Sequence, residues 1–282
     1  MELIRRVEAK LWNNLCCYWQ LRWLCKAPPL KILFSPFEQW QDTIQKGFKA
    51  TRHQIAFEQL QPERFSDFDL VVPLTVPDVL TAARNRESIA HSLLPSPTEQ
   101  AVNLCDDKHA FNLALMDKGL GRYIPPMATM LKPPYILKRS TGGYGMHTYL
   151  ITREADEAEH QEKIADPAYF KQQMIAGREE YATHVIARGG EIVTSLNIRY
   201  TFHEELPVKG KNRVICKHIC HCPHLELFAD ILRAIKYEGL CCFNYKMQGK
   251  VPMILEINPR FGASLCPYFA IFASRLAMMR RS

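Results

Sequence analysis

The sequence lacks several patterns that define well-known protein classes. It contains no apolar run of about eighteen residues, so no helix is expected to span a membrane. Its first 26 residues carry Arg22 and Lys26 within the apolar stretch and offer no A-x-A cleavage site, so a secretory signal peptide is not expected. The expected location is therefore the cytoplasm, where the ten cysteines would remain free thiols.

The glycine motifs that usually lead from a strand into a helix are absent as well. No G-x-G-x-x-G follows the first expected strand, at residues 31–34, and the glycines of the chain do not form a P-loop. No Ser-His-Asp set and no catalytic cysteine stands in a recognisable context. These absences disfavour a dinucleotide-binding domain and a nucleophilic hydrolase.

What the sequence does contain is typical of a folded globular protein. Its 282 residues are 47% hydrophobic and 23% charged, which is enough for one large domain or two small ones. The net charge of +7 favours an anionic ligand such as a nucleotide or a carboxylate, or a weak attraction to anionic membranes. It does not indicate nucleic acid binding.

Residues 1–29 are expected to be an amphipathic N-terminal extension. Apolar residues recur at roughly helical spacing through residues 1–26, with basic residues between them. Such a helix can rest on a membrane surface or on a partner protein, so membrane association is one expectation. The alternative is a helix that packs on its own domain.

Residues 30–97 predict a small parallel α/β domain, because strands there alternate with helices. The expected strands lie at residues 31–34, 54–57 and 69–73, and the expected helices at residues 36–49 and 78–85. The segment from Pro95 to Thr98 marks the expected boundary with the rest of the chain.

Residues 98–282 predict antiparallel sheets with helices, so the fold class expected for the whole chain is α/β plus α+β. Helices are expected near residues 99–104, 106–119 and 225–237, strands at 133–138, 148–152, 170–175, 181–187, 192–202, 240–247 and 253–257, and a last apolar segment at 265–279. Glycine turns at Gly189 and Gly249 favour hairpins between neighbouring strands.

The strand at residues 253–257 runs into the most informative residues of the chain. Side chains alternate faces along a strand, so Glu256, Asn258 and Arg260 are expected to point the same way. Two oxygen ligands beside a permanent cation suit Mg²⁺ bound to a polyphosphate. The alternative is a strand that ends at an ordinary surface turn.

A glycine-rich loop at residues 139–147 lies between two expected strands. Glycine allows close approach of the backbone and turns N–H groups toward a ligand, so the tip of this hairpin can fold over a phosphate chain. The strand before the loop ends in Lys138. The alternative is an ordinary glycine-rich turn.

Together these motifs resemble those of the ATP-grasp superfamily, most closely its carboxylate-amine ligases and the ATP-grasp domain of carbamoyl-phosphate synthase. The resemblance covers about residues 30–270 and depends on four motifs that occur in the family's order. They are Asp107-Lys108 at a helix start, Lys138 before Ser-Thr-Gly-Gly-Tyr-Gly, the run from Gln172 to Tyr181, and the run from Leu255 to Arg260. The resemblance implies a pre-ATP-grasp α/β layer over residues 30–97, followed by an ATP-grasp domain whose lobes, at about 98–175 and 176–282, clamp ATP between them.

The resemblance also implies roles for individual residues. Lys108 and Lys138 would neutralise the α and β phosphates, and Glu180 would lie near the ribose or the substrate. The remaining nucleotide site would consist of Ser140, Thr141, Gly142, Gly143 and Gly145 as the phosphate cover, Gln173, Met174 and Ile175 as the adenine hinge, and Leu255. Arg260 and Lys138 would act on the transferred phosphoryl group. Arg199 would hold the acceptor carboxylate, unless it is simply a surface arginine.

The implied cofactors are ATP and two Mg²⁺ or Mn²⁺ ions. Glu256 and Asn258 match the family's metal ligands, and Asn244 matches a third ligand on the neighbouring strand. The family usually has an acidic residue at that third position. A carboxamide can coordinate through its oxygen but brings no negative charge, so one ion is expected to bind more weakly.

Two functions follow from the resemblance. The first is an ATP- and Mg²⁺-dependent ligase that activates a small carboxylate as an acyl phosphate for attack by an amine or a thiol. The second is a nucleotide-binding module with weakened catalysis and a regulatory or scaffolding role. Either is compatible with a homo-oligomer.

The cysteines and histidines of residues 216–224 match no usual zinc spacing and are read as a strand, with a structural metal as the alternative.

Overall fold

The structure is a computed structural model that describes residues 4, 7–13, 15, 26–128, 130–143 and 145–280. Its first layer is a three-stranded sheet with the order β2-β1-β3 and parallel pairing throughout. The strands are β1 (Lys31–Phe34), β2 (Gln54–Phe57) and β3 (Leu70–Val72), and the helices are α2 (Glu38–Phe48), η1 (Pro62–Asp67), α3 (Val76–Arg84) and α4 (Arg86–Ile89). The predicted parallel α/β layer is confirmed.

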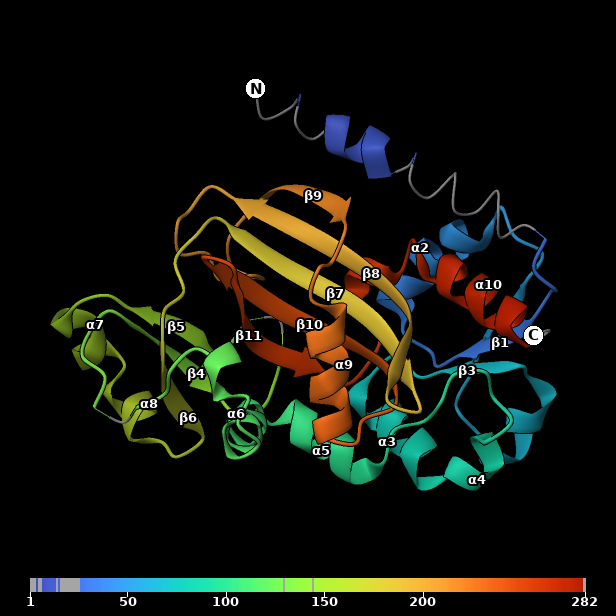
Figure 1. Cartoon of the computed structure of the whole chain (residues 1–282), viewed down its shortest axis with the longest axis horizontal. Coiled ribbons are helices and arrows are strands. Elements are labelled where there is room, and N and C mark those ends of the chain that lie inside the picture. The colour runs from blue at the N-terminus through green and yellow to red at the C-terminus, as the bar shows by residue number, and fades with distance from the viewer. Residues whose placement is uncertain are drawn as a thin grey trace.

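A second sheet of three antiparallel strands, ordered β5-β4-β6, lies apart from the others at the left of Figure 1. It consists of β4 (Tyr135–Arg139), β5 (Thr148–Ile151) and β6 (Tyr169–Gln173), with the short helices α7 (Glu154–Glu159) and α8 (Gln161–Ala165) between β5 and β6. The two helices were not expected from the sequence, because neither contains a fully buried residue that would mark an apolar stripe.

The large central sheet has five strands in the order β11-β10-β7-β8-β9, all antiparallel. Its strands are β7 (Glu179–Arg188), β8 (Glu191–Phe202), β9 (Val214–Cys220), β10 (Gly239–Gln248) and β11 (Val251–Asn258). Together the two antiparallel sheets confirm the predicted α+β part of the chain.

Both faces of the central sheet are covered. One face packs against α5 (Glu99–Asp106), α6 (Lys108–Asp117), η2 (Gly121–Tyr123) and α9 (Leu225–Ala234). The other face packs against the parallel layer and α10 (Phe269–Met279), which follows η3 (Ala263–Leu265). Phe34 of β1 makes edge contacts with Phe261 and Phe269, at 6.2 and 5.6 Å between ring centroids. The parallel layer therefore shares one core with the central sheet, while the predicted boundaries at residues 29 and 97 stay predictions.

The N-terminal helical residues 7–13 lie beside the outer strand β9 (Figure 1). Asn13 donates from Nδ2 to the carbonyl of Lys217 at 2.8 Å, and its Oδ1 accepts from the amide of Ile219 at 2.8 Å. The Asn13 side chain thus forms hydrogen bonds with a backbone carbonyl and a backbone amide of the edge strand β9. Apolar side chains at Val7 and Leu11 remain exposed, so packing on its own domain and an outward apolar surface are both present in this helix.

Within the described residues, no helix combines the length and the apolar character needed to cross a bilayer. The other expectations for residues 1–26, contact with a membrane or a partner, concern a segment of which residues 1–3, 5, 6, 14 and 16–25 lie outside the described part of the chain.

Candidate active site

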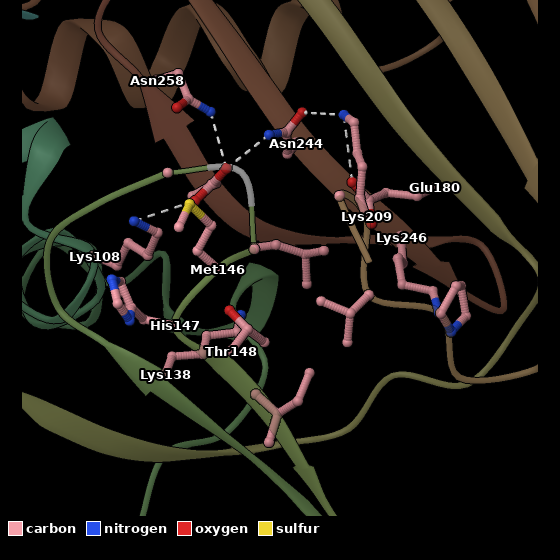
Figure 2. A pocket seen from close by; sticks show the side chains of 18 of the residues that line it. Lys108, Lys138, Met146, His147, Thr148, Glu180, Lys209, Asn244, Lys246 and Asn258 are labelled. Carbon is pink, nitrogen blue, oxygen red and sulfur yellow. Dashed lines mark hydrogen bonds and ion pairs between the residues drawn. The ribbon is translucent and has the colours of Figure 1, made fainter. Parts of the chain in front are cut away.

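A cavity of about 220 Å³ lies between the small sheet and the central sheet (Figure 2). Its lining includes most of the residues that the sequence singled out: Lys108, Lys138, Thr141, Gly142, Gly143, Gly145, Gln173, Met174, Ile175, Glu180, Asn244, Leu255, Glu256, Asn258 and Arg260. Segments far apart in the sequence therefore meet at one place.

Glu256 is placed in the cavity by an irregularity in strand β11. Asn244 of β10 pairs directly with Glu256, but the next pair along the strands is Tyr245 with Ile254, so Leu255 is an extra residue. A bulge of this kind lets consecutive side chains share a face. Leu255 and Glu256 accordingly both line the cavity, while Ile254 is buried on the opposite face.

The carboxylate of Glu256 is surrounded by donors. Oε1 accepts from Asn244 Nδ2 at 2.8 Å and from Asn258 Nδ2 at 3.0 Å, and Oε2 lies 3.3 Å from Lys108 Nζ. Burial alone would raise the pKa of Glu256, but Lys108, the two amides and Lys138 outweigh it and hold the pKa at about 2. The group is therefore a carboxylate at every physiological pH.

Two lysines from the other side of the cleft complete this cluster. Lys108 begins helix α6, whose start is fixed by Asp107 accepting from the amide of Ala110 at 2.9 Å. Lys138 ends the buried part of β4, is only 7% exposed, and donates to Gln172 Oε1 at 2.8 Å. Burial lowers the pKa of Lys138 to about 8, although Glu256 opposes the shift. A phosphate group beside Lys138 would restore its full positive charge.

The glycine-rich loop covers the cavity and is held there from both sides. Lys108 Nζ donates to the carbonyl of Gly142, and Lys211 Nζ donates to the carbonyl of Thr148 at 2.7 Å. Gly145 has a φ of +66°, and a Cβ added there would lie 2.3 Å from the carbonyl oxygen of Lys209. Only glycine allows this approach. The loop is thus packed against the segment that joins β8 to β9.

Substituting Gly145 with Ala is expected to lower ATP turnover about tenfold or more, because both the backbone conformation and the contact with Lys209 exclude a Cβ. Gly249→Ala is a matched control: its φ is +60°, but no atom lies within 4 Å of the added Cβ. ADP formation by the two variants provides the measurement. Equal losses in both variants would contradict a specific role for the contact between Gly145 and Lys209.

Part of the cavity wall is apolar and includes Ile136, Leu150, Ile175 and Leu255. Gln173 is the last residue of β6. Its backbone N–H donates to the carbonyl of Pro126 at 2.8 Å, which joins β6 to the chain before β4. Glu180, whose pKa is raised by burial, lies at the start of β7 beside this region.

Two predicted residues do not line the cavity. Arg199 pairs with Glu179 at 3.4 Å, and the neighbouring Tyr200 takes the side of β8 that faces the cavity. Because adjacent side chains of a strand point to opposite faces, Arg199 cannot join Tyr200 there. Ser140 lies beside the cavity through its backbone, whose carbonyl accepts from the amide of Lys108 at 2.8 Å. The ion pair with Glu179 fits the alternative of a surface arginine, and the carboxylate-binding role of Arg199 stays a prediction.

Sequence reasoning missed several lining residues: His184, Tyr200, Leu206, Lys209, Cys242, Lys246 and Ser264. Alternation along β10 would have found Cys242 and Lys246, which flank Asn244 at two-residue spacing. His184 Nε2 lies 2.8 Å from Ser264 Oγ. Burial, together with the charges of Lys209 and Arg260, lowers the pKa of His184 to about 3, so the imidazole stays neutral. No local pattern links these two residues, which are 80 positions apart.

No protein-family model and no curated protein matches the sequence. Solved structures do match. A D-alanine–D-alanine ligase from Bacillus anthracis aligns over 89% of this chain and 98% of its own, with a TM-score of 0.58 and 13% identity. A phosphoribosylamine–glycine ligase from Thermotoga maritima aligns over 84% of this chain and 70% of its own, with a TM-score of 0.61 and 14% identity. The chain has the ATP-grasp fold. An L-amino acid ligase from Bacillus licheniformis, with a TM-score of 0.58 and 13% identity, shares this ATP-grasp architecture over 86% of this chain and 70% of its own.

The ATP-grasp fold implies a divalent cation, and the residues present fit one. Glu256 is an ionised carboxylate, and Asn258 beside it adds an amide oxygen; such hard oxygen donors suit Mg²⁺. The Asn244 oxygen, by contrast, accepts from Lys209 Nζ at 3.0 Å. Among the described residues no three of His, Cys, Asp and Glu are grouped to hold a metal ion, and this holds for the cysteines and histidines of residues 216–224 too.

Proposed function

We propose that the protein is an ATP-dependent ligase that joins a small carboxylate to an amine. One observation carries the proposal: Lys108 and Lys138 face Glu256 and Asn258 across a cavity that a glycine-rich loop covers. Phosphoryl transfer requires positioning and charge neutralisation more than covalent chemistry, and this arrangement supplies both.

The reaction would proceed in two steps. A carboxylate oxygen attacks the γ phosphorus of ATP, the bond between that phosphorus and the β–γ bridging oxygen breaks, and ADP leaves. The amine nitrogen then attacks the carbonyl carbon of the acyl phosphate, inorganic phosphate departs with the bonding electrons, and the nitrogen loses a proton. A bound Mg²⁺ would neutralise phosphate charge during the first step.

The chain's own residues would act on charge and position. Lys108 and Lys138 would hold the phosphates, with Glu256 keeping Lys108 in place at 3.3 Å. Arg260, which lines the cavity and donates from Nη1 to the carbonyl of Phe261 at 2.8 Å, would stabilise the charge that develops on the transferred group. The apolar walls around Ile175 and Leu255 would hold the adenine ring.

A second candidate is a nucleotide-binding module with weakened turnover, which Asn244 favours because it brings no charge to a position next to Glu256. ADP release should be measured over a panel of small carboxylates, each with and without amines. ADP formation that rises with one pair supports the ligase. Tight ATP binding without stimulated ADP formation would support the module, and no ATP binding would contradict both.

A further inference from the structure

Lys209 reaches into the ATP-grasp cavity from the segment between β8 and β9, and neither the sequence nor the fold comparison gives it a role. Its Nζ lies 3.0 Å from Asn244 Oδ1 and 3.4 Å from Glu180 Oε1 (Figure 2). The same Nζ lies 4.3 Å from the centroid of the Tyr200 ring. Three elements of the central sheet thus converge on one ammonium group.

The turn that carries Lys209 is built to hold it there. Asn212 Oδ1 accepts from the amide of Val208 at 2.7 Å, and the carbonyl of Val208 accepts from the amides of Lys211 and Asn212 at 3.0 and 2.9 Å. The carbonyl of Lys209 is also the atom against which Gly145 of the covering loop packs. The backbone at Lys209 is therefore held by its own turn and by the covering loop, while the ammonium group is held by Asn244 and Glu180.

Asn244 has both ends of its amide engaged. Nδ2 donates to Glu256 Oε1 at 2.8 Å, while Oδ1 accepts from Lys209. A metal ion on that oxygen would have to displace Lys209, since a divalent cation and an ammonium group repel each other at such a distance. The cavity already contains six cationic residues, Lys108, Lys138, Arg139, Lys209, Lys246 and Arg260, against the carboxylates of Glu180 and Glu256.

We propose that this site uses a single divalent cation, held by Glu256 and Asn258, and that the Lys209 ammonium group supplies the second positive charge at Asn244. The inference rests on the proposed binding of ATP in this cavity. An ammonium group donates hydrogen bonds to phosphate oxygens and needs no free metal. The position beside Asn244 is therefore occupied by a cation before the nucleotide binds.

The experiment is a count of bound Mn²⁺ by electron paramagnetic resonance on the full chain, saturated with a non-hydrolysable ATP analogue. The wild-type protein is expected to bind about one Mn²⁺ per chain. The double variant Asn244→Asp with Lys209→Met, which exchanges the amide and ammonium for a carboxylate, is expected to bind about two. If the wild-type protein bound two Mn²⁺ ions together with the nucleotide, this inference would be overturned while the proposed function would stand.

Nucleotide affinity provides a second readout that separates Lys209 from a merely structural lysine. Lys209→Met is expected to weaken binding of the analogue about tenfold or more in metal-free buffer, where the ammonium acts without competition. Lys250→Met, in the exposed turn between β10 and β11, is the matched control and should leave affinity unchanged. Equal affinity in both variants would contradict a role for Lys209. If the wild-type protein binds no nucleotide, the proposed function falls and this inference falls with it.

Discussion

Replacing Glu256 with Gln is expected to reduce ADP formation about a thousandfold, or roughly 4 kcal/mol of transition-state stabilisation. Glu256 is the carboxylate that Lys108, Asn244 and Asn258 surround, and its pKa of about 2 shows how strongly these partners favour the charged form. Glutamine has the same shape but no charge, so it leaves Lys108 without its counterion and weakens any bound cation. Nucleotide binding should also lose its dependence on Mg²⁺.

Steady-state ADP formation, together with nucleotide titrations at several Mg²⁺ concentrations, would measure this effect. Glu179→Gln is the matched control, because Glu179 pairs with Arg199 and does not line the cavity. Its turnover should stay close to that of the wild-type protein. A Glu256→Gln variant that retains a tenth or more of the activity and an unchanged Mg²⁺ requirement would show that Glu256 is not the metal ligand.

Lys138→Met is expected to weaken ATP binding about a hundredfold, with a loss that depends on pH. Burial lowers the pKa of Lys138 to about 8 from its usual 10.5 in the nucleotide-free protein. Below pH 8 the ammonium is already charged and attracts phosphate. Above pH 8 the protein must take up a proton to bind ATP, so the affinity of the wild-type protein should fall as pH rises from 8 toward 10.

The Lys138→Met variant should lose this contribution to the pH dependence along with the affinity. Titrations of a non-hydrolysable ATP analogue between pH 7 and pH 9.5 provide the measurement. Lys171→Met, on the adjacent strand β6, is a suitable control, because Lys171 pairs with Glu157 at 3.3 Å and does not line the cavity. A wild-type affinity that stays flat across this range would mean that Lys138 does not titrate beside the phosphates.

The parts of the site that follow strand periodicity could be predicted from the sequence. Glu256 and Asn258 share a face because they are two residues apart on β11, and Lys138 is found where a short buried strand ends. Periodicity alone does not say which face of a strand meets a ligand: Arg199 and Tyr200 are adjacent on β8, and it is Tyr200 that lines the cavity. A shift of one residue along the strand therefore exchanges the side chain that faces the cavity.

The parts that depend on contacts between distant loops could not be predicted. Lys209 lies in an irregular segment, and its role appears only when Gly145 and Asn244 are seen to meet it. The bulge at Leu255 is likewise invisible in the sequence, since it arises from the pairing of β10 with β11. Such features depend on tertiary packing rather than on local preference.

The most direct test of the central claim is a calorimetric titration of the intact protein with a non-hydrolysable ATP analogue, with and without Mg²⁺. The expected result is one site per chain, with binding tightened about tenfold or more by Mg²⁺, which corresponds to roughly 1.4 kcal/mol. Binding should weaken when Lys138 is changed to Met. Absence of any nucleotide binding, or binding that neither Mg²⁺ nor the Lys138 substitution alters, would contradict the account.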